Sequence, residues 1–127
     1  MEKTILIIDD EEDFCYFVKK NLEAISNYEI ITATKGKKGL QIARKEKPDL
    51  ILLDIMMPGI DGLEVLKRLK KNENTQNIPV IMLTAKDEDE SKIRALGSFC
   101  DDYIVKPVEN VELKGKIHKV LSITKSA

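Results

Sequence analysis

The stretch Pro48-Asp49-Leu50-Ile51-Leu52-Leu53-Asp54 decides the fold of this chain. Four consecutive apolar residues end in a single carboxylate, and the segment Met57-Pro58-Gly59-Ile60-Asp61-Gly62, rich in turn residues, follows. A continuous apolar run of this length is typical of a strand that is buried on both faces of a parallel sheet. We therefore expect a strand near 49–53 that delivers Asp54 to a loop.

Three further apolar runs end in polar residues of different kinds. The carboxyl ends of parallel strands lie together, and sheets of this type build their sites at that edge. Carboxylates, a hydroxyl and an ammonium gathered there would suit a hard cation and a phosphoryl group. The runs are 5–8 before Asp9-Asp10, 80–83 before Thr84, and 103–105 before Lys106.

Apolar runs alternate with helix-period segments along the chain. We predict strands near 4–9, 29–33, 49–53, 79–83 and 101–105, and helices near 12–26, 36–46, 62–71, 87–97 and 109–121. Strict alternation implies an α/β fold, with a doubly wound, five-stranded parallel sheet and helices on both faces. The crossovers should be right-handed.

Length and composition place limits on function. A chain of 127 residues fits one domain, and we expect 1–127 to be that domain with a polar tail or linker stub at 122–127. Lys and Arg number 21 and Asp and Glu 22, so charge gives no case for binding nucleic acid or a membrane. The first apolar run is too short for a signal peptide, and no run is long enough to span a bilayer. We expect a cytoplasmic protein.

A few residues carry separate predictions. Cys15 and Cys100 fit no metal or redox spacing, so we expect buried or half-buried thiols without a disulfide. Asp61 is expected to cap the third helix, and His118 to be a solvated surface residue. Phe14 allows two interpretations, as part of the core stripe of the first helix or as a docking contact for a partner.

Taken together, the motifs resemble those of a known family. They are Asp9-Asp10, the segment from Asp54 to Gly62, Thr84-Ala85, and Asp101-Asp102-Tyr103-Ile104-Val105-Lys106-Pro107. In this order the chain resembles a receiver domain of bacterial-type two-component response regulators, which have the CheY-like (flavodoxin-like) fold. The resemblance implies a strand order of 2-1-3-4-5. It also implies that Asp54 takes a phosphoryl group from a phosphohistidine on a sensor histidine kinase or a histidine phosphotransfer protein. Phe99-Cys100 and Val108 depart from the family pattern, beside the presumed output face.

The acids point to a metal ion. Asp9, Asp10 and Asp54 would repel one another, which raises the pKa of at least one carboxyl unless a cation is bound. Mg²⁺ prefers oxygen ligands and is often held by a few carboxylates with a phosphate. We assign Asp10 and Asp54 as direct ligands and Asp9 as a ligand through water. By resemblance, the backbone carbonyl of Met56 completes the set.

The remaining residues would bind and sense the phosphoryl group. Lys106 and Thr84 would each take a phosphoryl oxygen, so that no general base is needed for phosphorylation. The resemblance implies a cis Lys106–Pro107 peptide bond. It also implies a switch in which Thr84 moves toward the phosphoryl group and Tyr103 changes rotamer, altering the surface of the fourth helix, fifth strand and fifth helix. That surface would serve a downstream effector, an attached output domain or a phosphorylation-dependent dimer.

The leading prediction is therefore a phosphoacceptor switch that is no enzyme beyond its own phosphorylation and slow dephosphorylation. A phosphatase with an aspartyl-phosphate intermediate would commonly have a second aspartate two residues after the nucleophile, where this chain has Met56. A flavin carrier would need a phosphate-binding loop after the first strand, but residues 9–13 are acidic. A pseudo-receiver that only binds partners would not need Asp10, Asp54, Thr84 and Lys106 together.

Overall fold

Five parallel strands form one sheet in the order β2-β1-β3-β4-β5. The computed structural model describes residues 2–25, 27–85 and 99–125. The strands are β1 (Lys3–Ile8), β2 (Tyr28–Ala33), β3 (Leu50–Asp54), β4 (Val80–Thr84) and β5 (Asp102–Val105). The helices are α1 (Glu12–Ile25), α2 (Gly36–Glu46), α3 (Gly62–Lys71) and α5 (Asn110–Lys125). The predicted fold class and strand order are confirmed.

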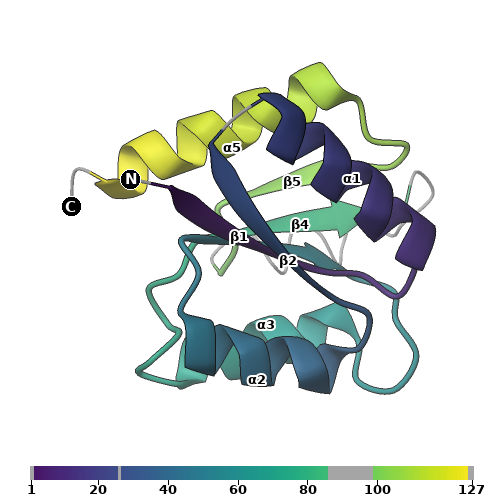
Figure 1. The fold of residues 1–127 in the computed structure, drawn as a ribbon. Coiled ribbons are helices and arrows are strands. Elements are labelled where there is room, and N and C mark those ends of the chain that lie inside the picture. The colour runs from purple at the N-terminus through teal and green to yellow at the C-terminus, as the bar shows by residue number, and fades with distance from the viewer. Residues whose placement is uncertain (1, 26, 86–98, 126–127) are drawn as a thin grey trace.

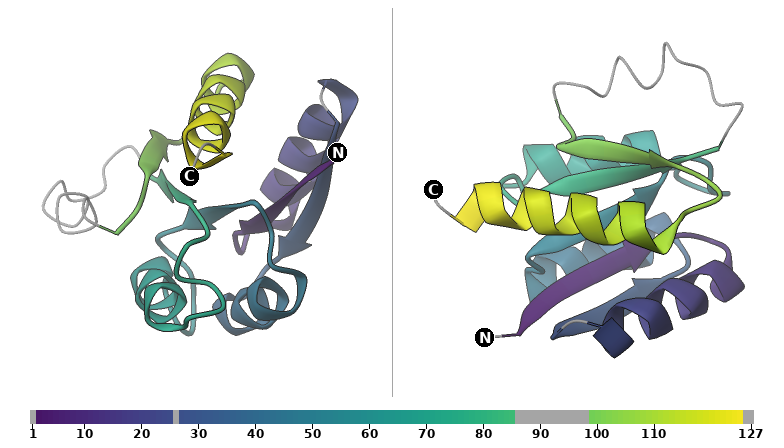
Figure 2. Two further views of the ribbon diagram at one scale, coloured as in Figure 1. Left: turned by 90° about the vertical axis from the view of Figure 1, so that its left-hand side faces the viewer. Right: turned by 90° about the horizontal axis from the view of Figure 1, so that it is seen from above.

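The helices lie in two layers, with α1 and α5 on one face of the sheet and α2 and α3 on the other (Figure 1). The view along the helices in Figure 2 shows the same separation. Strand β3 explains the arrangement, because side chains alternate between the faces of a strand. Leu50 and Leu52 belong to the core cluster that contains residues of α1 and α5, whereas Ile51 and Leu53 belong to the cluster with α2 and α3. All five residues of β3 are buried.

Local signals explain where the helix after β3 begins. Asp61 is the N-cap of α3, and its Oδ1 accepts a hydrogen bond from the backbone N–H of Glu64 at 3.0 Å. The prediction of a capping role for Asp61 is thus confirmed. Three basic residues occupy the last turn, where they complement the helix dipole.

The predicted boundaries differ from the observed ones by a residue or so, except in α5. This helix extends to Lys125, four residues beyond the predicted end at 121. Ser122 Oγ donates to the carbonyl oxygen of His118, one turn back, at 2.7 Å. The helix predicted near 87–97 lies outside the described residues.

Two surface and core predictions are also confirmed. His118 is exposed, Cys15 is buried, Cys100 is half-buried, and both thiols are free. Within the described ranges, no helix has the length and apolar character that crossing a bilayer requires.

Candidate phosphoryl and metal site

The register of the sheet brings the predicted site residues to one edge. Ile8 pairs with Leu53, which places Asp9 level with Asp54. Backbone hydrogen bonds continue just beyond the strands, from Asp9 N to Ala33 O at 3.0 Å and from Lys106 N to Thr84 O at 2.7 Å. The side chains that follow β1, β3, β4 and β5 are therefore held by rigid backbone rather than by free loops.

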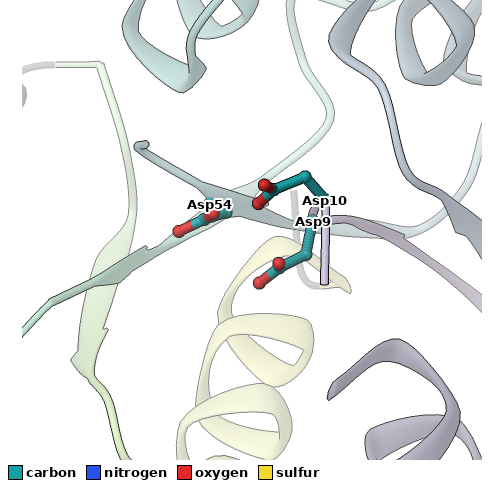
Figure 3. A group of neighbouring side chains, drawn as sticks. All are labelled: Asp9, Asp10 and Asp54. Atoms are coloured by element: carbon teal, nitrogen blue, oxygen red, sulfur yellow. The ribbon is translucent and has the colours of Figure 1, made fainter. Parts of the chain in front are cut away.

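Three carboxylates form the centre of the site. Asp9, Asp10 and Asp54 each offer an oxygen, and these oxygens all lie within 4.8 Å of one another. Figure 3 shows the three side chains gathered where β1 and β3 end. Asp9 and Asp54 are buried and Asp10 is exposed, so the cluster opens to solvent on the side of Asp10.

Lys106 supplies the positive charge. Its Nζ donates to Asp9 Oδ2 at 2.7 Å and to Glu11 Oε1 at 3.0 Å, and it lies 3.6 Å from Asp54 Oδ1. The ring centroid of Phe14 is 4.5 Å from the same nitrogen, within the range of a cation–π contact. Lys106 therefore joins the ends of β5, β1 and β3 and the first turn of α1.

Burial and crowding shift the ionisation of these groups. Burial raises the pKa of Asp54 to about 7, and the carboxylate of Asp9 adds to that rise while Lys106 opposes it. Burial also raises the pKa of Asp9, although the hydrogen bond from Lys106 opposes that rise. Burial lowers the pKa of Lys106, but hydrogen bonds to Asp9 and Glu11 outweigh it and raise the value to about 12. The site thus holds a permanent cation beside carboxylates that are costly to ionise together.

Thr84 ends β4 with a buried hydroxyl that the described part of the chain leaves unpaired. The residue is fully buried, and its Oγ1 has no hydrogen-bond partner among the described residues. Buried hydroxyl groups are nearly always paired, so an orphan of this kind points to a ligand. Thr84 and the carboxylates together provide acceptor and donor groups for a phosphoryl group with a divalent cation.

The Tyr103 side chain is partly exposed in this conformation. It is 43% exposed, and Lys116 Nζ is 5.2 Å from its ring centroid. The same ammonium donates to Tyr103 O at 2.6 Å and to Asp102 Oδ1 at 3.2 Å. Thr84 pairs with Val105, so Tyr103 is two residues along the neighbouring strand and on the same face of the sheet.

The loop after Asp54 is closed tightly against β3. Gly62 N donates to Ile55 O at 2.8 Å, and a Cβ added at Gly62 would lie 2.0 Å from the carbonyl oxygen of Asp54. Gly59 has φ of +79°, which an L side chain rarely adopts. Both glycines of the segment from Met57 to Gly62 are thus required by geometry. Met56, the predicted carbonyl ligand, has an exposed side chain in this loop.

Some of the remaining residues at the site were predicted from the sequence, and two were not. The Lys106–Pro107 peptide bond is cis, as the resemblance implied. Phe14 packs against the α1–α5 core cluster and also contacts Lys106, so its core interpretation is confirmed and a second contact is added. Glu11 and Lys116 were missed. Proximity to Asp9 in the sequence was the signal for Glu11, whereas no spacing links Lys116 to Tyr103.

Comparison with known proteins identifies the family. A family model described as response regulator receiver domain matches residues 5–118. The transcriptional regulatory protein PhoP for alkaline phosphatase synthesis of Bacillus subtilis is 43% identical over 121 residues, which cover 95% of this chain and 49% of that protein. The phosphate regulon transcriptional regulatory protein PhoB of Pseudomonas aeruginosa is 44% identical over 122 residues, covering 96% of this chain and 53% of that protein. The chain thus spans about half the length of these curated relatives.

Solved structures agree with this assignment. A response regulator receiver domain protein (CheY-like) from Methanospirillum hungatei aligns with a TM-score of 0.89 and 31% identity, over 99% of this chain and 98% of that one. The chain belongs to the response regulator receiver domain family of two-component systems. This membership disfavours the phosphatase and flavin-carrier alternatives.

Proposed function

We propose that Asp54 accepts a phosphoryl group and that the chain acts as a phosphorylation-controlled switch. One observation carries the proposal. The Asp54 carboxylate lies where two other carboxylates, within 4.8 Å, and the Lys106 ammonium, at 3.6 Å, converge at one edge of the sheet. Few purely structural roles would justify burying such an arrangement, because each charge removed from water costs free energy.

The reaction is a displacement at phosphorus. An Asp54 carboxylate oxygen forms a bond to the phosphorus of the donor, and the bond from phosphorus to the donor's leaving atom breaks with its electron pair. The leaving atom is an imidazole nitrogen of a phosphohistidine or an acetate oxygen of acetyl phosphate. Lys106 and Thr84 each donate a hydrogen bond to a phosphoryl oxygen, which stabilises the charge that spreads over these oxygens.

The donor set fits Mg²⁺. Asp10 and Asp54 would hold the ion directly with the backbone carbonyl of Met56, and Asp9, which already accepts from Lys106 and from Glu11 N, would act through water. When bound, Mg²⁺ neutralises the crowded carboxylates and one phosphoryl oxygen. The protein's own part is to hold the Asp54 oxygen in place, with Lys106 opposing the rise in the Asp54 pKa that burial causes.

Signalling would follow from Thr84 and Tyr103. A phosphoryl group on Asp54 gives the orphan hydroxyl of Thr84 an acceptor, and Tyr103 can then move inward on the same face of the sheet. The altered surface around β5 and α5 would be read by an effector, an output domain or a second copy of the chain. We propose that residues 1–127 form one receiver domain that works in the cytoplasm. Its phosphoryl donor would be a sensor histidine kinase or a histidine phosphotransfer protein.

The test is intact mass after incubation with Mg²⁺ and acetyl phosphate, with a phosphohistidine donor as a second arm. The parent should gain one phosphoryl group, and Asp54→Asn should gain none. Asp49→Asn is a matched control, because Asp49 lies next to the other end of β3 and accepts from Thr4 N. Equal labelling of the parent and Asp54→Asn would contradict the proposal. No labelling of the parent by either donor would instead favour a pseudo-receiver that only binds partners.

A further inference from the structure

Lys106 has more acceptors around its ammonium than a phosphoryl-binding role requires. An ammonium has three N–H donors. Asp9 and Glu11 take two of them, at 2.7 and 3.0 Å. Asp54 Oδ1 is 3.6 Å away, within ion-pair range but beyond a normal hydrogen bond. Lys106 therefore makes its short hydrogen bonds to Asp9 and Glu11, and not to the proposed phosphoacceptor Asp54.

Glu11 differs from the other acids that contact Lys106. In the described part of the chain, the carboxylates close enough to share a metal ion are those of Asp9, Asp10 and Asp54, and Glu11 is outside this group. The side chain of Glu11 is 64% exposed, whereas that of Asp9 is fully buried. Glu11 can therefore leave Lys106 at little cost, because water can solvate its carboxylate.

The backbone keeps Glu11 beside Lys106. Asp9 Oδ1 accepts a hydrogen bond from Glu11 N at 2.9 Å, and Glu11 O accepts from Cys15 N in the first turn of α1. The Phe14 ring, one turn along, contacts the same ammonium. Glu11, just before α1, and Phe14, in its first turn, thus offer Lys106 a carboxylate and an aromatic ring in addition to its contacts with Asp9 and Asp54.

We propose that Glu11 competes with the phosphoryl group for Lys106. Glu11 binds the ammonium while Asp54 is unmodified and releases it when a phosphoryl group is present. The charge of Glu11 also opposes the arrival of an anionic donor, so both effects slow phosphorylation. Glu11 is in this view a positioning residue that sets how readily the switch turns on, and the inference rests on the proposed function of Asp54.

The first test compares Glu11→Gln with Glu12→Gln. Each variant removes one exposed carboxylate, and the two positions are adjacent. Glu11 accepts a hydrogen bond from Lys106, which makes Glu12→Gln the control. With Mg²⁺ and ionic strength fixed, the second-order rate of phosphorylation by acetyl phosphate should rise about fivefold in Glu11→Gln, the scale of a partly exposed ion pair. Glu12→Gln should match the parent.

The second test observes the contact without phosphorylation. In metal-free, unmodified protein, ¹⁵N-edited NMR of the Lys106 ammonium reports the exchange of its protons with water. Glu11→Gln should speed this exchange severalfold and Glu12→Gln should not. A merely structural role for Glu11 at the start of α1, through its backbone, would leave the Lys106 signal unchanged.

The outcomes separate the two proposals. A phosphorylated parent with equal rates in both variants, or with a slower rate in Glu11→Gln, overturns the competition and leaves the phosphoacceptor role intact. An unchanged Lys106 exchange rate in Glu11→Gln also overturns the competition. A parent that takes no phosphoryl group from acetyl phosphate or a phosphohistidine donor overturns the proposed function, and the competition with it.

Discussion

One buried threonine precedes β4 and another ends it, and the two are in different situations. Thr75, in the segment that leads into the strand, is 1% exposed, and its Oγ1 donates to Leu69 O at 2.7 Å. Thr84, the last residue of the strand, is 0% exposed and its Oγ1 has no partner among the described residues. The first hydroxyl holds the end of α3, whereas the second serves no interaction of the described fold. Of these two buried hydroxyls, the one before β4 therefore stabilises the fold, and the one at its carboxyl end remains available to a ligand.

Charged groups show the same contrast. Near the amino end, Lys70 Nζ donates to Ile78 O at 2.9 Å and Asp101 Oδ2 accepts from Val80 N at 2.9 Å. Both charged side chains there form hydrogen bonds to backbone atoms at or just before the start of β4. At the carboxyl end, Asp9 and Asp54 share one ammonium with Glu11. The largest effects on stability should therefore come from this second end.

Replacement of Lys106 by Met should have the largest destabilising effect. In metal-free protein near neutral pH, it leaves the buried carboxylate of Asp9 without its cation, which should cost roughly 3 kcal/mol of unfolding free energy. Lys70→Met is the comparison at the amino end, and it should cost about 1 kcal/mol because the carbonyl oxygen of Ile78 loses its ammonium donor. Urea unfolding in EDTA measures both. Equal losses would remove the distinction between the two ends.

The carboxyl end should also make the unfolding free energy depend on pH. The pKa of Asp54 is about 7 in the folded protein against an ordinary 3.8, so the folded state binds this proton more tightly. Its contribution is fully present below about pH 4 and is lost as pH rises through about 7, by at most roughly 4 kcal/mol. The difference in unfolding free energy between Asp54→Asn and the metal-free parent should therefore grow in favour of the variant across this window. Asp49→Asn should show no such growth, and a flat difference for Asp54→Asn would contradict the shift.

The two threonines provide the most direct test. Thr75→Val should lose about 1 kcal/mol because it leaves Leu69 O without its donor. Thr84→Val should gain up to about 1 kcal/mol, since it replaces an unpaired buried hydroxyl with a methyl group. The same Thr84→Val protein should be phosphorylated more slowly than the parent. Chemical denaturation and intact mass measure these effects. A destabilised Thr84→Val protein would show that the hydroxyl has a structural partner after all.

The smallest effect is expected at Lys116. Replacement by Met removes a cation from the Tyr103 ring and a hydrogen bond to Tyr103 O, at a cost of about 0.5 kcal/mol. The ring should then spend less time on the surface, which its NMR chemical shifts would report. Lys119→Met, at an exposed position of α5, is the control. Identical Tyr103 shifts in both variants would exclude a role for Lys116 in holding the ring.

Most residues at the carboxyl edge of the sheet can be predicted from the sequence, because the register of the strands determines where they lie. Asp9, Asp54, Thr84 and Lys106 each follow an uninterrupted apolar run, and parallel register then brings them together without further information. Asp61 and Gly62 are predictable for the same reason, since capping and close approach are local requirements.

Contacts made by long side chains could not be predicted. Lys106 could have reached several acids, and only the structure shows Glu11 at 3.0 Å and Phe14 at 4.5 Å. Lys116 reaches across from α5 to Tyr103, a choice among rotamers that leaves no periodic signal. The end of α5 was missed because exposed, polar helical turns resemble a tail in composition.

Gly62 makes the fold intolerant of substitution at a position that has no side chain. Its missing Cβ lets the start of α3 lie against the backbone of Asp54, where an added carbon would be 2.0 Å from the carbonyl oxygen. A screen of random substitutions scored on signalling should therefore deplete position 62 as strongly as position 54, although glycine has no side chain to offer a reactant. Intolerance to substitution would then identify Gly62, which supports the backbone of the proposed nucleophile, as well as Asp54 itself.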